Sequence, residues 1–209
     1  SSTEGIGLTP EQLQGDQVAS LAVPECGTKF VRGMLEDSRP QTFSDLVRIS
    51  GFSHGTNVWL DNAQELIKNG TCKLNEAIST RDDVMNFLIH RGMNKKNSFF
   101  VMENVRKGKG IEKRNKQGQA TTEFEKEMRE NNIPEWFIES CKKISYLFPR
   151  AHAVAYVMMA FRIAWFKVYH PLAFYAAYFS IRAKAFDLRI MTGDLHTQLK
   201  EFNRIKALD

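Results

Sequence analysis

The feature that most constrains this chain is a helix-start pattern that occurs four times. In each copy a threonine is followed three residues later by Gln, Asp or Glu, as in the capping box at the start of an α-helix. The four threonines are Thr9, Thr42, Thr80 and Thr122. No stretch alternates apolar with polar residues as a half-buried strand would. The sequence therefore predicts an all-α fold, an irregular assembly of about 8–10 helices.

Asparagine, glycine and proline mark the ends of further helices. Asn94 is expected to cap a helix that Gly108 ends. Pro149 is expected to open the longest helix, which runs to about Tyr169 before Pro171 interrupts it. A second apolar helix and a more polar final helix are expected after this proline.

The apolar stretch 151–166 raises the question of a membrane span. Arg162 interrupts the stretch after eleven residues, whereas a span needs roughly twenty apolar residues with few charges. We therefore expect a buried core helix here, and no membrane partner.

The composition supports a folded, basic protein. Hydrophobic residues make up 43% of the 209 residues, which is enough to form a core and excludes wholesale disorder. Lys and Arg number 29 against 24 Asp and Glu, a net charge of +5 that favours a polyanionic partner. The basic residues gather in 91–118 and in 140–186, and the second stretch contains no acidic residue. The polar segment 108–121 is expected to form a surface loop.

Cysteine usage and the first residues bear on the cellular compartment. Cys26, Cys72 and Cys141 lack the paired spacing of a zinc site or a disulfide framework, which is typical of a reducing cytosol. The segment 1–4 has neither the basic start nor the apolar run of a signal peptide. We expect a cytoplasmic protein, and the lack of a starting Met indicates a piece of a longer protein or a processed product.

The sequence predicts no catalytic residue and no metal site. It contains no P-loop, no GxGxxG and no HExxH pattern. Glu36–Asp37 and Asp82–Asp83 are the only adjacent acidic pairs, and Asp83 already belongs to a capping box. The chain alone is therefore not expected to be a complete enzyme.

Two glycine-containing segments nevertheless look like anion sites. In 51–56, glycines would let a phosphate or base approach Ser53, His54 and free backbone amides, unless the segment is an ordinary turn between helices. In 105–110, cations alternate with glycines, although a solvated helix end would favour cations as well.

A third candidate, 147–156, is the start of the helix expected after Pro149. Its first turn would present unpaired amides together with Arg150 and His152, as helix N-termini that bind phosphate do. Phe148 or Tyr156 could stack on a base. The alternative is a core helix with a polar first turn.

Six longer segments carry the most specific signal. They are ECGTKFVRGMLED, TFSDLVRISGFSHGTNVWLDNAQELI, RDDVMNFLIHRG, ENVRKGKG, IPEWFIESCKKI and FPRAHAVAYVMMAFRIAWFKVYHPLAFYAAYFSIRA. In this order they resemble one region of the PolC-type bacterial replicative polymerases, which are C-family DNA polymerase III α subunits. The departures are modest: this family more often has Asp at the position of Asn57, Gly at that of Asp61 and Lys at that of Arg150.

The resemblance implies that residues 1–187 form the fingers domain of such a DNA polymerase. A basic surface-loop insertion would occupy about 110–121, and a helical extension would follow at 188–209. In this family the catalytic aspartates belong to the palm, which would lie mostly before Ser1, and they hold two Mg²⁺ ions. Mg²⁺ is therefore expected in the complete enzyme and not on this chain, and the isolated chain is expected to be inactive.

The resemblance also implies the partners and the site. The fingers would hold the incoming deoxynucleoside triphosphate (dNTP) and the primer–template DNA, and the full-length polymerase would bind the sliding clamp and other replisome proteins. The residues expected at the dNTP are Ser53, His54, Arg91, Phe148, Arg150, His152 and Tyr156. Those expected at DNA or triphosphate phosphates are Arg106, Lys107 and Lys109. The rival interpretation is a non-catalytic helical module that coats nucleic acid, which the net charge alone would also fit.

Overall fold

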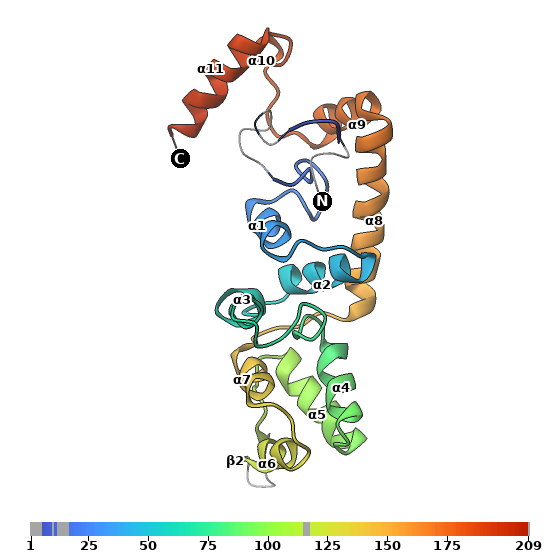
Figure 1. Ribbon diagram of the computed structural model, residues 1–209, viewed down its shortest axis with the longest axis vertical. Helices are drawn as coiled ribbons and strands as arrows, with labels where there is room; N and C mark the ends of the chain where they lie inside the picture. Colours follow the sequence, from blue (N-terminus) through green and yellow to red (C-terminus); the bar gives the residue numbers. More distant parts are fainter. Residues whose placement is uncertain (1–5, 10, 12–16, 115–117, 209) are drawn as a thin grey trace. The chain divides into compact units, whose positions relative to one another are not determined.

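The structure is a computed structural model that describes residues 6–9, 11, 17–114 and 118–208 (Figure 1). Its first helices are α1 (Lys29–Ser38), α2 (Phe43–His54), α3 (Gln64–Lys68), α4 (Arg81–His90) and α5 (Lys95–Arg106). The others are α6 (Glu123–Glu130), α7 (Glu135–Lys143), α8 (Arg150–Tyr169), α9 (Pro171–Ala177), α10 (Leu188–Met191) and α11 (Leu195–Lys206). The irregular turns η2 (Trp59–Ala63) and η3 (Tyr178–Arg182) and a hairpin of β1 (Lys113–Arg114) and β2 (Ala120–Thr121) complete the described elements.

The all-α prediction is confirmed. The described residues form eleven α-helices, of which α3 and α10 have only five and four residues. Each strand of the hairpin has two residues, and both strands lie within the segment predicted as a surface loop. The chain divides into two compact units, residues 1–164 and 165–209, and α8 runs from the first into the second.

The helix starts predicted at Thr42, Thr80, Asn94 and Thr122 are confirmed, but the capping box predicted at Thr122 does not form. Capping boxes form at Thr42 and Thr80, and the Asn94 side chain accepts hydrogen bonds from the first turn of α5. Thr122 precedes α6 without a side-chain cap, because its ψ of 14° is not the extended backbone of a capping residue. The box predicted at 9–12 includes Pro10 and Gln12, which lie outside the described residues.

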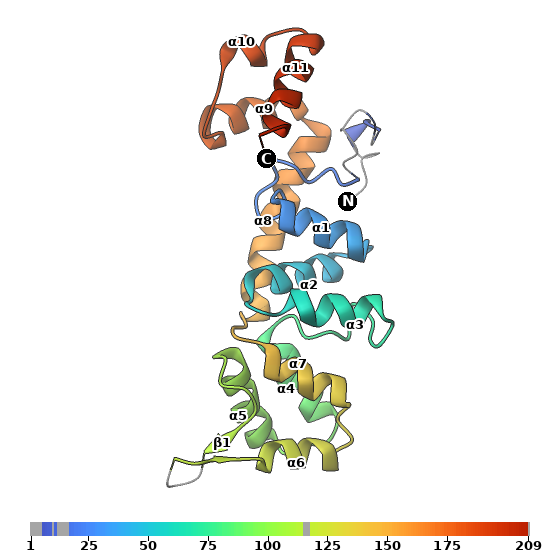
Figure 2. The same ribbon diagram turned by 90° about the vertical axis from the view of Figure 1, so that its left-hand side faces the viewer.

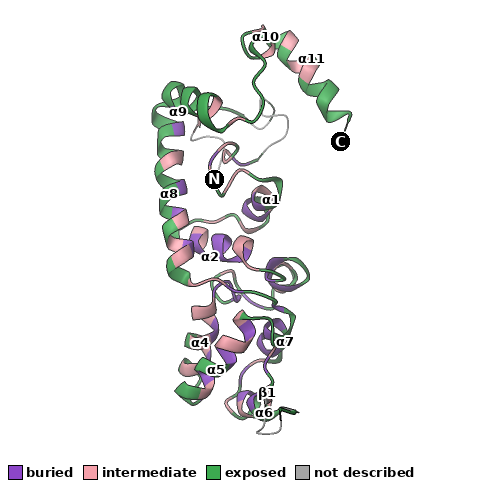
Figure 3. Cartoon of the chain, turned by 180° about the vertical axis from the view of Figure 1, so that it is seen from behind, coloured by how far each residue is buried: buried purple, intermediate pink, exposed green. Residues whose placement is uncertain are grey.

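The first unit has one large apolar core. α4 and α5 lie side by side (Figure 2), and the helical residues of this core come from every helix between α1 and α7 except α3 (Figure 3). The largest fully buried side chains include Met34, Phe52, Leu88, Val101, Met128 and Phe137. This core fixes the C-terminal end of α2 and the N-terminal end of α4, which carry the site described below.

The prediction of a buried core helix after Pro149 is wrong in one respect. α8 begins where expected, but within the first unit it buries only one face, formed by Ala153, Val157 and Ala160. That face packs on Val47 of α2, whereas Met158, Met159 and Phe161 are exposed. By length and composition α8 could span a membrane, and 22% of its apolar window is buried. An amphipathic pattern is absent because the exposed face is also apolar.

The second unit has little core of its own. Among its described residues, only Lys167 and Phe174 are buried. The Lys167 ammonium lies 5.9 Å from the centre of the Phe174 ring, a cation–π geometry that compensates part of the cost of burying the charge. Large apolar side chains such as Leu172 and Ile181 are 86% and 79% exposed.

The turn η2 accounts for the glycine that the resemblance expects at the position of Asp61. Asp61 has a φ of 55° and a ψ of 16°, the left-handed conformation that glycine adopts without strain. The resemblance expects glycine at this position. The backbone there is held in place because the Lys143 ammonium donates a 2.6 Å hydrogen bond to the Asp61 carbonyl.

Candidate functional site

Five of the predicted site residues come together where α2 meets the start of α8. Ser53 and His54 end α2, Phe148 precedes α8, and His152 and Tyr156 lie one turn apart on α8. The His152 ring stacks on Phe148 with centroids 4.7 Å apart and lies 4.6 Å from Tyr156. The His54 ring lies 5.2 Å from both His152 and Tyr156. We call these four rings (His54, Phe148, His152, Tyr156) the ring cluster.

Hydrogen bonds fix the orientation of His54. Its Nδ1 lies 2.6 Å from the Ser50 carbonyl oxygen, which can only accept, so Nδ1 carries the proton. Its Nε2 lies 3.4 Å from the Glu25 carboxylate. The Ser53 hydroxyl also donates to the Ser50 carbonyl, at 2.9 Å. The hydroxyl and the imidazole are therefore held by the end of α2, and all four rings of the cluster are half-buried.

The glycines of segment 51–56 serve packing, and residues 51–54 do not have the loop or turn conformation that the two sequence interpretations assumed. Residues 51–54 belong to α2 and form neither a phosphate loop nor a turn. A Cβ on Gly51 would lie 2.7 Å from the Ser79 carbonyl oxygen, and one on Gly55 would lie 2.8 Å from the Tyr146 carbonyl oxygen. The Thr56 amide donates to the Tyr146 carbonyl at 3.0 Å, so it is not free to bind an anion. Glycine is required because two backbones meet there.

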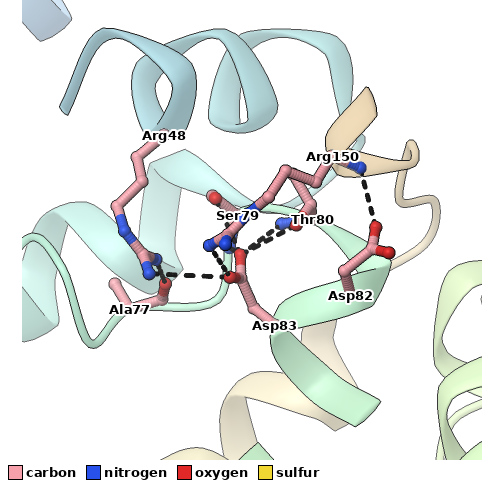
Figure 4. A network of polar contacts seen from close by, with 7 residues as sticks. All are labelled: Arg48, Ala77, Ser79, Thr80, Asp82, Asp83 and Arg150. Atoms are coloured by element: carbon pink, nitrogen blue, oxygen red, sulfur yellow. Dashed lines mark hydrogen bonds and ion pairs between the residues drawn. The ribbon is translucent and has the colours of Figure 1, made fainter. Parts of the chain in front are cut away.

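Arg150 lies beside the ring cluster in the chain but points to a second network, drawn in Figure 4. Its guanidinium lies 2.8 Å from Asp83 Oδ1, and its backbone N–H donates a 2.7 Å hydrogen bond to Asp82 Oδ2. The first amide of α8 is therefore occupied by a carboxylate from α4. At the place predicted for phosphate, the structure therefore has a carboxylate of the chain itself.

Asp83 is the centre of this network. Its Oδ2 accepts hydrogen bonds from the backbone N–H groups of Ser79 and Thr80, at 3.1 and 2.8 Å, and from both hydroxyls. Its Oδ1 lies 3.5 Å from the guanidinium of Arg48, which also donates to the Ala77 carbonyl at 2.9 Å. The Asp83 and Arg48 side chains are only 10% and 13% exposed, so each needs the other as a charge partner.

The basic residues of segment 105–110 lie at the end of α5. Arg106 and Lys107 both pair with Glu103, at 2.5 and 3.0 Å. Lys109 is exposed. Gly108 has a φ of 67°, and a Cβ there would lie 2.5 Å from the Ser145 carbonyl oxygen. This glycine therefore allows the strand-like segment before α8 to pass close to α5, where the Leu147 amide donates to the Arg106 carbonyl.

Arg91 lies apart from the other residues predicted at the dNTP. It follows the last residue of α4, whereas Asp82 lies in the first turn of that helix. Nine residues of helix separate them by about 13 Å. The Arg91 guanidinium lies 5.3 Å from the centre of the Phe87 ring, a cation–π contact.

Sequence reasoning missed the acidic half of the site. Asp82, Asp83 and Glu25 each contact a predicted site residue from a distant part of the chain. The adjacent pair Asp82–Asp83 was visible in the sequence, but nothing local indicates that it meets Arg150. Within the described residues, no group of three or more His, Cys, Asp or Glu could hold a metal ion.

Comparisons with known proteins agree on one family. Residues 12–132 match the bacterial DNA polymerase III alpha subunit finger domain family. The DNA polymerase III PolC-type of Thermotoga maritima is 55% identical over 212 residues, covering 100% of this chain and 15% of its own length. The corresponding proteins of Bacillus subtilis and Caldanaerobacter subterraneus are 56% and 54% identical, covering 90% and 99% of this chain. The chain spans about 12–15% of the length of these relatives.

Proposed function

The chain belongs to the finger domain family of the bacterial DNA polymerase III alpha subunit, PolC type, and we propose that its α2–α8 junction binds the incoming dNTP. The observation that carries this proposal is the convergence of four rings, from segments about a hundred residues apart: His54, Phe148, His152 and Tyr156. They lie beside the start of α8, which is the only one among the described helices with an arginine and a histidine in its first turn.

We assign different parts of the nucleotide to the two sides of the α8 start. The ring cluster offers flat, half-buried aromatic faces, on which a base can stack. Arg150 and the amides of the first turn offer positive charge and hydrogen-bond donors to the triphosphate. His152 stands between them, with Ser53 at the edge of the cluster. Arg91 would act further from the base, on the phosphates or on template DNA.

The segment at the end of α5 is proposed to contact the DNA backbone. Arg106, Lys107 and Lys109 place three cations within four residues. Such contacts add affinity without sequence preference, because they neutralise phosphates and release counterions.

We propose that the complete protein is a cytoplasmic replicative DNA polymerase that also binds the sliding clamp and other replisome proteins. In the reaction the primer 3′-hydroxyl attacks the α-phosphate of the dNTP. The described residues offer no carboxylate group that fits a two-metal site, so we assign Mg²⁺ to the palm. The contribution of this chain is to bind the nucleotide and orient its phosphates for in-line attack.

Two substitutions in the complete polymerase test the assignment. Arg150→Ala should raise the KM for all four dNTPs alike, by roughly tenfold to a hundredfold, because a charged hydrogen bond contributes about 1.5–3 kcal/mol. Phe148→Ala should change the four KM values unequally, because it would alter contacts to the base. Steady-state incorporation kinetics with each dNTP measure both effects.

Arg129→Ala is the matched control. Arg129 is also a half-exposed arginine in an ion pair, with 51% of its side chain exposed against 45% for Arg150, but it lies on α6. Its KM values should equal those of the wild type. Unchanged KM values for Arg150→Ala would refute the proposed triphosphate site.

A further inference from the structure

The first turn of α8 already binds carboxylates that come from another part of the chain. Asp82 accepts the Arg150 backbone N–H, and Asp83 pairs with the Arg150 guanidinium, although both aspartates precede Arg150 by 67 residues or more. A helix-start amide and a guanidinium are the groups that bind phosphate in many proteins. The two carboxylates therefore occupy positions that the proposed function assigns to phosphate oxygens.

We infer that Asp82 and Asp83 compete with the incoming triphosphate for the start of α8, and that Arg150 moves from Asp83 to the phosphates when a nucleotide binds. This inference rests on the proposed function, because it concerns the same site. The two aspartates are positioning residues: they set the affinity for the nucleotide and take no part in the chemistry.

Asp83 can release Arg150 because its carboxylate has other partners. Ser79 and Thr80 continue to donate to Oδ2, and Arg48 stays within 3.5 Å of Oδ1 (Figure 4). No buried carboxylate would lose its last partner, which is the costly event in breaking an ion pair.

Arg150 is the arginine that is free to move. Its side chain is 45% exposed, whereas that of Arg48 is 13% exposed and bound to the Ala77 carbonyl as well. Burial lowers the pKa of Arg48, the Asp83 charge opposes this shift, and the like charge of Arg150 lowers the pKa further. The repulsion between the two guanidiniums therefore favours departure of the exposed one.

Asp82 contacts the backbone of α8, which is held by the helix and cannot move as the Arg150 side chain can. Its Oδ2 lies 2.7 Å from the backbone nitrogen of Arg150, which is fixed by α8. A phosphate oxygen can reach this amide only when the carboxylate turns away. Until then the negative charge of Asp82 also repels the triphosphate.

Asp82→Asn in the complete polymerase tests the inference, because asparagine has the same shape and no charge. We expect the KM for all four dNTPs to fall alike, by about two- to tenfold, with kcat unchanged. Inorganic tripolyphosphate should inhibit the variant at a concentration lower by the same factor. Asp37→Asn is the control: this aspartate lies on α1, where it accepts a hydrogen bond from the Gln64 side chain and pairs with Lys68.

The outcomes separate this inference from the proposed function when Arg150→Ala is measured in parallel. A KM that falls for Asp82→Asn and rises for Arg150→Ala supports both. An unchanged or raised KM for Asp82→Asn, beside a raised KM for Arg150→Ala, overturns the competition and leaves the nucleotide site in place. Unchanged values for both variants reject the site itself. Asp82→Ser, which also removes the charge, replaces Asp82→Asn if that variant does not fold.

Discussion

The starts of α4 and α8 are joined by a hydrogen bond, yet they are capped in opposite ways. α4 is capped by its own sequence, because Asp83 accepts from the backbone N–H of Thr80 three residues earlier. α8 is capped by a residue of another helix, because its first amide donates to Asp82 from the start of α4. A local cap needs only residues at the start of its own helix. A cap supplied by another helix depends on tertiary structure, and in the proposed function another anion replaces it.

The two caps therefore have different roles: the contacts of Asp83 stabilise the fold, whereas those of Arg150 belong to the proposed nucleotide site. Around Asp83, nearly buried charges and four hydrogen bonds from Ser79 and Thr80 hold α4 against α2. Around Arg150, the contacts are exposed and few, so they contribute little to stability. We therefore expect substitutions on the two sides of this junction to have effects of different size and kind.

The largest effect is expected at the local cap. Asp83→Ala should lower the free energy of unfolding by about 3–5 kcal/mol, because it leaves the buried Arg48 guanidinium without its carboxylate. Urea unfolding followed by circular dichroism measures this. Asp82→Asn should cost less than about 1 kcal/mol in the same assay. Equal losses for the two variants would mean that both caps are structural.

A smaller effect is expected at another local cap, that of α5. Asn94→Ala should cost about 1 kcal/mol, because the Asn94 side chain accepts hydrogen bonds from Lys96 and Asn97 N–H groups. Asn86→Ala, at an exposed position within α4, is the control and should be neutral or slightly stabilising. If Asn94→Ala were no more destabilising than Asn86→Ala, local capping would not explain helix stability in this chain.

The smallest effect is expected from pH, at the end of α5. Hydrogen bonds from Arg106 and then Lys107 lower the pKa of Glu103 from 4.5 to about 2. Because the folded pKa is the lower one, the stabilisation is complete above pH 4.5 and is lost as pH falls toward 2. Thermal unfolding should therefore show a steeper loss of stability over this range for the wild type than for Glu103→Gln. Parallel curves for the two proteins would contradict the ion pairs seen here.

Much of the fold could be predicted because its signals are local. The starts of α2, α4 and α5 depend on residues within one turn, and the sequence shows them directly. The capping box at Thr122 is the exception, since the Glu125 carboxylate that would complete it binds Arg129 and Lys142 instead. Arg129 lies one turn further along α6, and Lys142 comes from α7, so one of the competing ion pairs is local and the other is tertiary.

The site could be predicted only in part. Resemblance and residue type indicated the ring cluster, and the structure brings those rings together. The roles of Gly51 and Gly55 could not be predicted, because they depend on the approach of backbones from distant segments. The same holds for the meeting of Asp82 with Arg150 across 68 residues of chain.

The most direct test of the nucleotide site is a structure of the complete polymerase with primer–template DNA and an incoming dNTP. We expect the triphosphate at the first turn of α8, with a phosphate oxygen about 3 Å from the Arg150 guanidinium. Arg150 would no longer contact Asp83, and Arg48 would still do so. A bound dNTP whose phosphates lie elsewhere, with Arg150 still paired with Asp83, would contradict the account.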